Sequence, residues 1–243
     1  MRVLSTLRFT LLRLMRNYIV LLLLLAVPIA LLTVFSVILS GMVDEAGRPY
    51  FDQTALTMVL AFQLFGGSTV MSYLNEDLFA RNRERMTVAP FNRTLYAFSI
   101  LLAGSAFSFL LGAAIMAYTR LVLGLVWANW GWTLYLIALM AVLSSIVCVI
   151  FVCGVKSFST AERLSEVYGV GFVLLAGLFF PMPQHAVFEF MGSYGNPLTL
   201  SVGAVRAVEI GNWNEAWFQA NIVLAAIGFL FPVMLVMGRR RLR

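Results

Sequence analysis

Charged residues are scarce in this sequence. Asp, Glu, Lys and Arg make up 12% of its 243 residues, and hydrophobic residues make up 61%. Soluble domains contain about 25% charged residues, so this composition excludes an ordinary soluble domain. The apolar residues form long runs that are typical of membrane-spanning helices. We therefore predict an all-α integral membrane protein.

Residues that build catalytic and metal sites are nearly absent. His185 is the only histidine, which excludes a His-rich metal site. It also argues against a serine-hydrolase centre at Ser193, because both residues fall on one predicted outer loop. No G-x-x-x-x-G-K-[ST] motif occurs, which excludes nucleotide binding through a P-loop. We predict no catalytic residue, no metal site and no cofactor bound by the chain itself.

Cysteine is also rare, and the two cysteines are not expected to pair. Cys148 and Cys153 fall in one apolar run, five positions apart. On a helix with about 100° per residue they point roughly 140° apart, which does not suit a disulfide. We interpret them as apolar filling.

Six apolar runs each approach the ~20 residues that a bilayer core requires. They are predicted to span the membrane at 18–40, 54–74, 95–121, 132–152, 161–180 and 217–237. Pro28 lies in the middle of the first run and is expected to bend it. Trp127, Trp130 and Trp132 cluster between the third and fourth runs, which is typical of an interfacial aromatic belt.

Basic residues predict the orientation of these spans. Fourteen of the 17 fall on one side, in segments 1–17, 75–93 and 238–243 and at Lys156 and Arg163. The positive-inside rule then puts both termini in the cytoplasm, as six spans allow. The net charge of +6 is explained in this way, so we expect no nucleic acid partner. A bacterial plasma (inner) membrane is the expected location.

The first 17 residues predict an amphipathic helix. Leu4, Leu7, Leu11 and Leu14 share one arc, and Arg13 belongs to the opposite, polar arc. Such a helix lies on an anionic membrane surface. A disordered basic leader is the alternative. We divide the chain into this helix, 1–17, and a single transmembrane domain, 18–243.

Two further segments interrupt the apolar pattern. Segment 75–93 carries seven ionisable groups with helical spacing of apolar residues, so it must lie in water or at the membrane surface, where we expect it to bind a soluble partner. Segment 181–211 is too apolar for an ordinary outer loop, and we predict two re-entrant half-helices at 186–191 and 198–208. An amphipathic surface loop is the alternative for the second segment.

These features, in this order, resemble the membrane subunits of type-2 ATP-binding-cassette (ABC) exporters. A basic interfacial helix precedes the first span. Glu76, the Glu84-Arg85 step, Pro90 and Arg93 follow in the first inner loop. In the outer region, Pro181 precedes Asn196-Pro197-Leu198-Thr199 and Arg206. Arg81-Asn82-Arg83 departs from the small residues usual before the Glu-Arg step.

The resemblance implies the roles of particular residues. The ATPase-coupling helix would include Glu76, Arg83, Glu84, Arg85, Met86, Pro90 and Arg93. The outer gate would include Phe179, Phe180, Pro181, Asn196, Pro197 and Arg206. The possible pathway residues are Gln63, Asn75 and Tyr168. The alternatives are that the basic loop residues only orient the chain, that the prolines only break helices, and that the pathway residues only form interhelical hydrogen bonds.

The resemblance also implies partners. A separate ATPase, present as a dimer, would bind ATP and Mg, and a second permease subunit, identical or a similar sister chain, would complete the pathway beside membrane lipid. The apolar interior favours a lipophilic or amphiphilic substrate such as a drug, an antibiotic, a lipid-linked molecule or a hydrophobic peptide. The competing hypotheses are a non-transporting assembly or sensor subunit, and a self-sufficient channel or secondary transporter. An ATPase that co-purifies with the chain separates the first hypothesis from the others.

Overall fold

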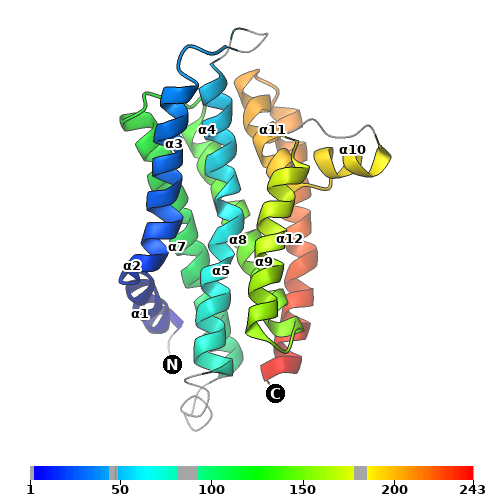
Figure 1. Cartoon of the computed structure of the whole chain (residues 1–243). Helices are drawn as coiled ribbons and strands as arrows, with labels where there is room; N and C mark the ends of the chain where they lie inside the picture. Colours follow the sequence, from blue (N-terminus) through cyan, green and yellow to red (C-terminus); the bar gives the residue numbers. More distant parts are fainter. Residues whose placement is uncertain (1–2, 44–46, 48, 81–91, 178–184, 243) are drawn as a thin grey trace.

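The structure is a computed structural model that describes residues 3–43, 47, 49–80, 92–177 and 185–242. Within these ranges the regular elements are helices, with one isolated β-bridge between Val43 and Pro49. The long helices lie side by side as a bundle (Figure 1), which confirms the predicted all-α fold. In chain order the elements are α1 (Val3–Met15), α2 (Tyr18–Leu21), η1 (Leu22–Ala26), α3 (Val27–Ile38), α4 (Tyr50–Ala61), α5 (Gln63–Leu74), η2 (Asn75–Phe79), α7 (Arg93–Leu121), α8 (Trp130–Gly154), α9 (Phe158–Leu175), α10 (Ala186–Ser193), α11 (Pro197–Glu209) and α12 (Trp213–Leu242).

Five segments of the described chain are long and apolar enough to cross a membrane. They are Tyr18–Ile38, Tyr50–Phe79, Arg93–Leu121, Trp130–Gly154 and Trp213–Arg241. Each overlaps one predicted span. The remaining prediction, 161–180, overlaps the 18-residue helix α9, which carries three charged residues, Glu162, Arg163 and Glu166.

Helix α9 nevertheless makes a passage along the bundle. A chain that crosses five times ends on the side opposite to where it began. Figure 1 shows the N- and C-terminal ends at the same end of the bundle. Since α9 also packs against α5 and α8, it provides the sixth passage. We call the end with both termini the terminal end.

The first span changes its helical geometry just before Pro28. The π-helical turn η1 lies between α2 and α3, and Pro28 is in the first turn of α3. Proline has no N–H, and its ring crowds the carbonyl of the residue four positions earlier. A wider π turn gives the ring room without breaking the helix. The predicted bend of this span stays a prediction.

The centre of the bundle depends on close contacts among α5, α7 and α8. Ser144 of α8 donates a hydrogen bond to the Leu64 carbonyl (2.6 Å) and accepts one from the Gly67 N–H (3.1 Å). A Cβ atom on Gly67 would overlap the Ser144 carbonyl, and one on Gly66 would overlap the Ser108 side chain. Small residues allow this approach, which drives helix association in membranes.

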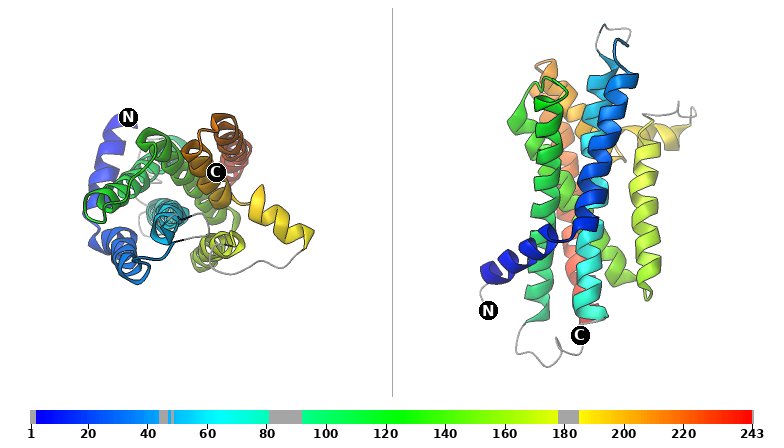
Figure 2. Two further views of the ribbon diagram at one scale, coloured as in Figure 1. Left: turned by 90° about the horizontal axis from the view of Figure 1, so that it is seen from above. Right: turned by 60° about the vertical axis from the view of Figure 1, so that its left-hand side comes forward.

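Two short helices, α10 and α11, connect α9 to α12 at the end opposite the termini. Helix α11 packs along α12 with Leu198, Val202 and Val205 buried, whereas α10 projects away from the bundle (Figures 1 and 2). The predicted pair of short helices is therefore present. Their entry into a membrane stays a prediction.

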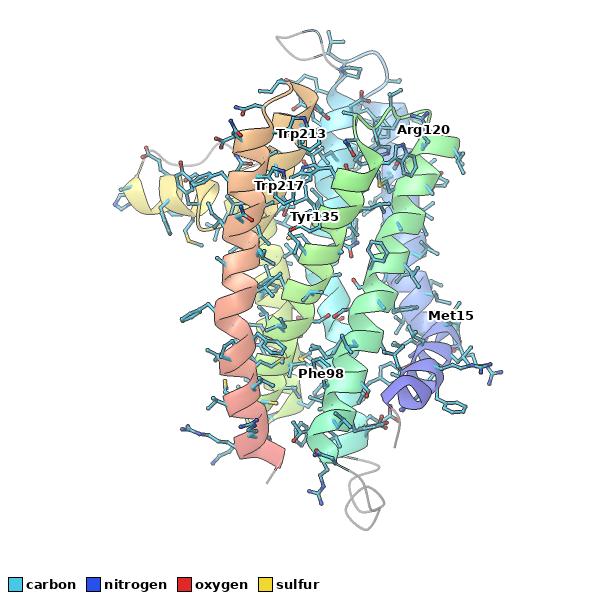
Figure 3. All side chains as sticks on the ribbon, turned by 180° about the vertical axis from the view of Figure 1, so that it is seen from behind. Met15, Phe98, Arg120, Tyr135, Trp213 and Trp217 are labelled. Carbon is cyan, nitrogen blue, oxygen red and sulfur yellow. The ribbon has the colours of Figure 1, made fainter. Side chains whose placement is uncertain are left out.

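The aromatic-belt prediction is wrong for two of the three tryptophans. Trp132 is buried, and its Nε1 donates to the Ala204 carbonyl of α11 (3.0 Å). Its ring contacts Trp213 and Trp217 of α12 edge-on, with centroids 5.7 and 4.8 Å apart. Figure 3 labels these two α12 residues. Trp127 is also buried. A buried N–H needs a partner, so the Trp132 indole fixes α8 to α11, and the Trp127 indole fixes its loop to Thr119 of α7.

We expect the Gly67→Ala variant to be destabilised by about 1–3 kcal/mol, because the added methyl group would push α8 away from α5. The measurement is thermal unfolding of the purified protein in detergent. The matched control is Gly171→Ala in α9, where no atom lies within 4 Å of the new Cβ. Equal melting temperatures for the two variants would contradict the close α5–α8 contact.

Candidate functional site

A charged cluster joins α1 to the end of the second span at the terminal end. Arg13 of α1 donates from Nη1 to both carboxylate oxygens of Asp77 (3.0 and 2.9 Å) and from Nη2 to Glu76 Oε2 (2.8 Å). The Asp77 side chain is only 3% exposed, whereas the Arg13 side chain is 40% exposed. A buried carboxylate requires such a partner, and the planar guanidinium bonds two carboxylates at once because Nη1 faces Asp77 and Nη2 faces Glu76.

Two tyrosines complete this cluster. The Tyr96 hydroxyl of α7 donates to Asp77 Oδ2 (2.9 Å). The Arg13 guanidinium carbon lies 4.5 Å from the centroid of the Tyr73 ring, which is cation–π geometry. We call Arg13, Tyr73, Glu76, Asp77 and Tyr96 the Arg13 cluster. It connects four elements, namely α1, α5, η2 and α7.

The charges of the cluster stabilise one another. Partial burial by itself lowers the pKa of Arg13, but the hydrogen bond to Asp77 and the negative charges of Asp77 and Glu76 outweigh it. The pKa of Arg13 therefore lies above its ordinary value, and the guanidinium is charged at every physiological pH.

The backbone of η2 explains how one arginine reaches two consecutive carboxylates. Side chains of neighbouring residues in a regular α-helix point about 100° apart. At Asn75 the helix widens into a π turn, which ends where the Ala80 N–H donates to the Asn75 carbonyl (2.8 Å). Such turns are frequent at functional sites. Here the turn carries Glu76, the first of the predicted coupling residues, together with Asp77.

The described residues include only the two ends of the predicted coupling segment. Glu76 lies in the Arg13 cluster, and Arg93 is the first residue of α7. Asn92 caps that helix, because its side chain accepts the Thr94 and Leu95 N–H groups (3.0 and 3.2 Å). The other predicted coupling residues, Arg83, Glu84, Arg85, Met86 and Pro90, lie outside the described residues.

The Asn-Pro pair of the predicted outer gate holds α11 against α9. Asn196 is fully buried; its Oδ1 accepts the Leu198 N–H (2.9 Å) and its Nδ2 donates to the Phe172 carbonyl (2.8 Å). Pro197 is the first residue of α11, a position where its missing N–H costs nothing. The pair therefore starts one helix and anchors it to another.

Arg206 lies apart from the Asn-Pro pair. Its Nη2 donates to Gln53 Oε1 of α4 (3.2 Å), at a cavity of about 280 Å³ that Asp52 and Glu209 also line. The structure thus places the described outer residues in two locations around α11. The remaining predicted gate residues, Phe179, Phe180 and Pro181, lie outside the described residues.

The three possible pathway residues occupy different environments. Gln63 is 2% exposed and accepts a hydrogen bond from Ser108 of α7 (3.0 Å), which is an interhelical bond inside one chain. Asn75 begins η2 and is half-buried. Tyr168 lines an apolar cavity of about 160 Å³, and its buried hydroxyl has no hydrogen-bond partner among the described residues. The structure does not bring these three side chains together.

The comparison with known families identifies the chain. The family model described as ABC-2 type transporter matches residues 2–210, from α1 through the end of α11. The chain belongs to this family. It is therefore the permease component of an ABC transporter, and membership implies association with an ABC ATPase. A comparison with curated proteins gives no match.

Among the residues that the structure describes, no group of three or more His, Cys, Asp or Glu side chains is placed to hold a metal ion.

Sequence reasoning missed most of the Arg13 cluster in this permease. Arg13 was assigned to a polar arc facing the membrane surface, and Asp77 and Tyr96 received no role. One signal was present: Glu76 and Asp77 are adjacent carboxylates at the end of an apolar span and need a cation close by. The nearest basic residues in the sequence are Arg81, Arg83 and Arg85, so proximity in the sequence does not single out Arg13.

We expect the Arg13→Gln and Asp77→Asn variants of the permease each to be destabilised, because each leaves a charged partner without its bond. In a double-mutant cycle the two substitutions should be non-additive by about 1–3 kcal/mol. Thermal unfolding of the four proteins in detergent measures this coupling.

The control for this cycle is Arg16→Gln, an exposed arginine in the turn directly after α1. Its effect should add to that of Asp77→Asn within about 0.5 kcal/mol. Additive behaviour of Arg13→Gln with Asp77→Asn would show that the contact does not hold α1 to the bundle.

Proposed function

We propose that this permease is half of an exporter in which segment 75–93 binds a cleft of the partner ATPase, which holds ATP and Mg. The contact that supports this proposal is the one that Arg13 makes with Glu76 and Asp77, at 2.8 to 3.0 Å. It fixes the start of segment 75–93 to α1, while Arg93 begins α7 at the other end of the segment.

Movement of such a segment has a direct route into the bundle. A push on the residues after η2 reaches Asp77, and Asp77 is bonded to α1 through Arg13 and to α7 through Tyr96. Helix α5 continues into η2 and packs closely on α8. We infer that closure of the ATPase dimer moves these elements together, as rigid-body switching requires.

A second permease subunit is part of the proposal. Glu162, Arg163 and Glu166 are exposed on α9, and Glu166 lies eight residues from the helix start, or about 12 Å along the axis. A carboxylate at this depth avoids lipid and marks a protein contact or an aqueous path. A two-fold ATPase dimer also requires two docking segments. We propose that the α9 side faces the second subunit, which is the same chain or a sister chain.

The cavity beside Tyr168 supports an apolar substrate. It is lined mainly by aliphatic and aromatic side chains, with Phe172 and Pro197 on its wall, and it lies between α9 and the outer helix α11. We propose a lipophilic or amphiphilic molecule as the substrate, such as a drug, an antibiotic, a lipid-linked molecule or a hydrophobic peptide. The substrate would leave past α11 and the predicted gate at Phe179, Phe180 and Pro181.

The proposed location is the bacterial plasma (inner) membrane, with both termini and segment 75–93 in the cytoplasm. Most basic residues of the sequence fall in the segments at the terminal end, as the positive-inside rule requires. The ATPase would therefore bind at the end of the bundle that carries the Arg13 cluster.

We expect the charge reversals Glu84→Arg and Arg85→Glu to separate ATP hydrolysis from transport, because both remove charge-assisted contacts to the ATPase. The measurement pairs ATP hydrolysis by the reconstituted complex with uptake of lipophilic fluorescent dyes into inside-out vesicles. Uptake should fall at least tenfold, while membrane insertion stays intact.

The matched control is Arg8→Glu, which reverses an exposed charge on α1 outside segment 75–93. It should retain dye uptake and ATPase binding. Normal uptake by both reversed variants in an intact ATPase complex would overturn the assignment of segment 75–93.

A further inference from the structure

An apolar cavity of about 260 Å³ lies on the side of the bundle formed by α7, α8 and α12, in the half nearest the terminal end. Its walls include Ala97, Phe98 and Leu101 of α7 and Phe231 and Leu235 of α12. Figure 3 labels Phe98 between these two helices. The Phe98 and Phe231 rings meet edge-on with centroids 6.5 Å apart. The cavity is separate from the one beside Tyr168.

The polar residues of this cavity lie at its mouth. Asn92 and Thr94 come from the start of α7, and Arg239 comes from the last turns of α12. Arg239 is exposed and forms no ion pair with any residue in the described part of the chain. Arg241 is used differently, because it bonds the Lys156 carbonyl (3.4 Å) and stacks on Phe79. The mouth therefore presents a positive charge, and none of the described residues that line the cavity is acidic.

The depth of the cavity matches one leaflet. Phe231 and Arg239 are eight residues apart on α12, which is about 12 Å along the helix axis. The hydrocarbon core of a bilayer is about 30 Å thick. A charged residue at the end of a span belongs at headgroup level, so from Arg239 the cavity would reach into less than half of the bilayer.

We propose that this cavity binds an acyl chain of an anionic phospholipid, with the lipid phosphate at Arg239 and the Asn92 and Thr94 side chains. An apolar cleft between spanning helices with a basic mouth at headgroup level has the chemistry that such lipids recognise. The two cavities share no lining residue, so the lipid is separate from the proposed substrate cavity. In the orientation given under the proposed function, this lipid would belong to the cytoplasmic leaflet. The proposal that the lipid is anionic does not depend on that orientation.

The test is native mass spectrometry of the purified permease with equal amounts of phosphatidylglycerol and phosphatidylcholine that carry the same acyl chains. The wild type should retain phosphatidylglycerol preferentially. Arg239→Gln should lower that preference about fivefold and leave phosphatidylcholine retention unchanged. Ala97→Phe, which fills the cavity from a half-buried position, should lower retention of both lipids.

Two variants serve as matched controls. Ala225→Phe adds the same ring to an exposed position of α12 outside the cavity, and Arg240→Gln removes an exposed arginine of the same helix that does not line it. Both should behave like the wild type. Equal retention of the two lipids by the wild type, or equal losses in Ala97→Phe and Ala225→Phe, would overturn the proposal. Neither ATP nor the ATPase is present in this experiment, so its result does not depend on the transport proposal. If Ala97→Phe does not fold, Arg239→Gln still tests the proposal, because Arg239 is exposed.

Discussion

The bond between one guanidinium and two neighbouring carboxylates determines the structure of the terminal end of this permease. Asp77 is almost fully buried, and a buried carboxylate without a cation is strongly destabilising. Arg13 satisfies it and in doing so fixes the position of α1, which otherwise contacts the bundle mainly through apolar residues such as Leu14. Tyr96 adds α7 to the same bond network. The amphipathic helix is therefore a bonded part of the bundle.

The helices differ in how far they are enclosed. In the most apolar window of the second and fourth spans 78% of the residues are buried, against 11% in the first and 17% in the last. Helices α5 and α8 thus form a tight centre in which Gly67 and Ser144 allow backbone contact. At the opposite end Trp132 and Asn196 fix α11 by hydrogen bonds to backbone carbonyls. The arrangement suits a rigid centre that moves relative to peripheral helices and partners.

Hydropathy and charge predicted the larger features because they reflect the bilayer directly. Five spans, the amphipathic helix and the short helices of segment 181–211 follow from the lengths of apolar runs and the breaks between them. Contacts between distant segments did not follow. The sequence around Trp132 would look the same if its indole lay at a membrane interface or inside the protein. Likewise, the sequence around Arg13 does not distinguish a side chain that faces lipid headgroups from one that faces Asp77. The choice depends on a partner 64 or 72 positions away in the sequence, which periodicity does not encode.

The most direct test of the account is a distance measurement across the Arg13 cluster. Spin labels at Met15 and Ser72, both on exposed positions, would be compared with labels at Met15 and Val236 of α12, in a chain with Cys148 and Cys153 replaced by alanine. Pulsed electron paramagnetic resonance of the complex with its ATPase would record both distances without nucleotide and with trapped ATP. The account predicts an unchanged Met15–Ser72 distance and a changed Met15–Val236 distance. A Met15–Ser72 distance that shifts on ATP binding would contradict it, because α1 would then move independently of the segment that Arg13 holds.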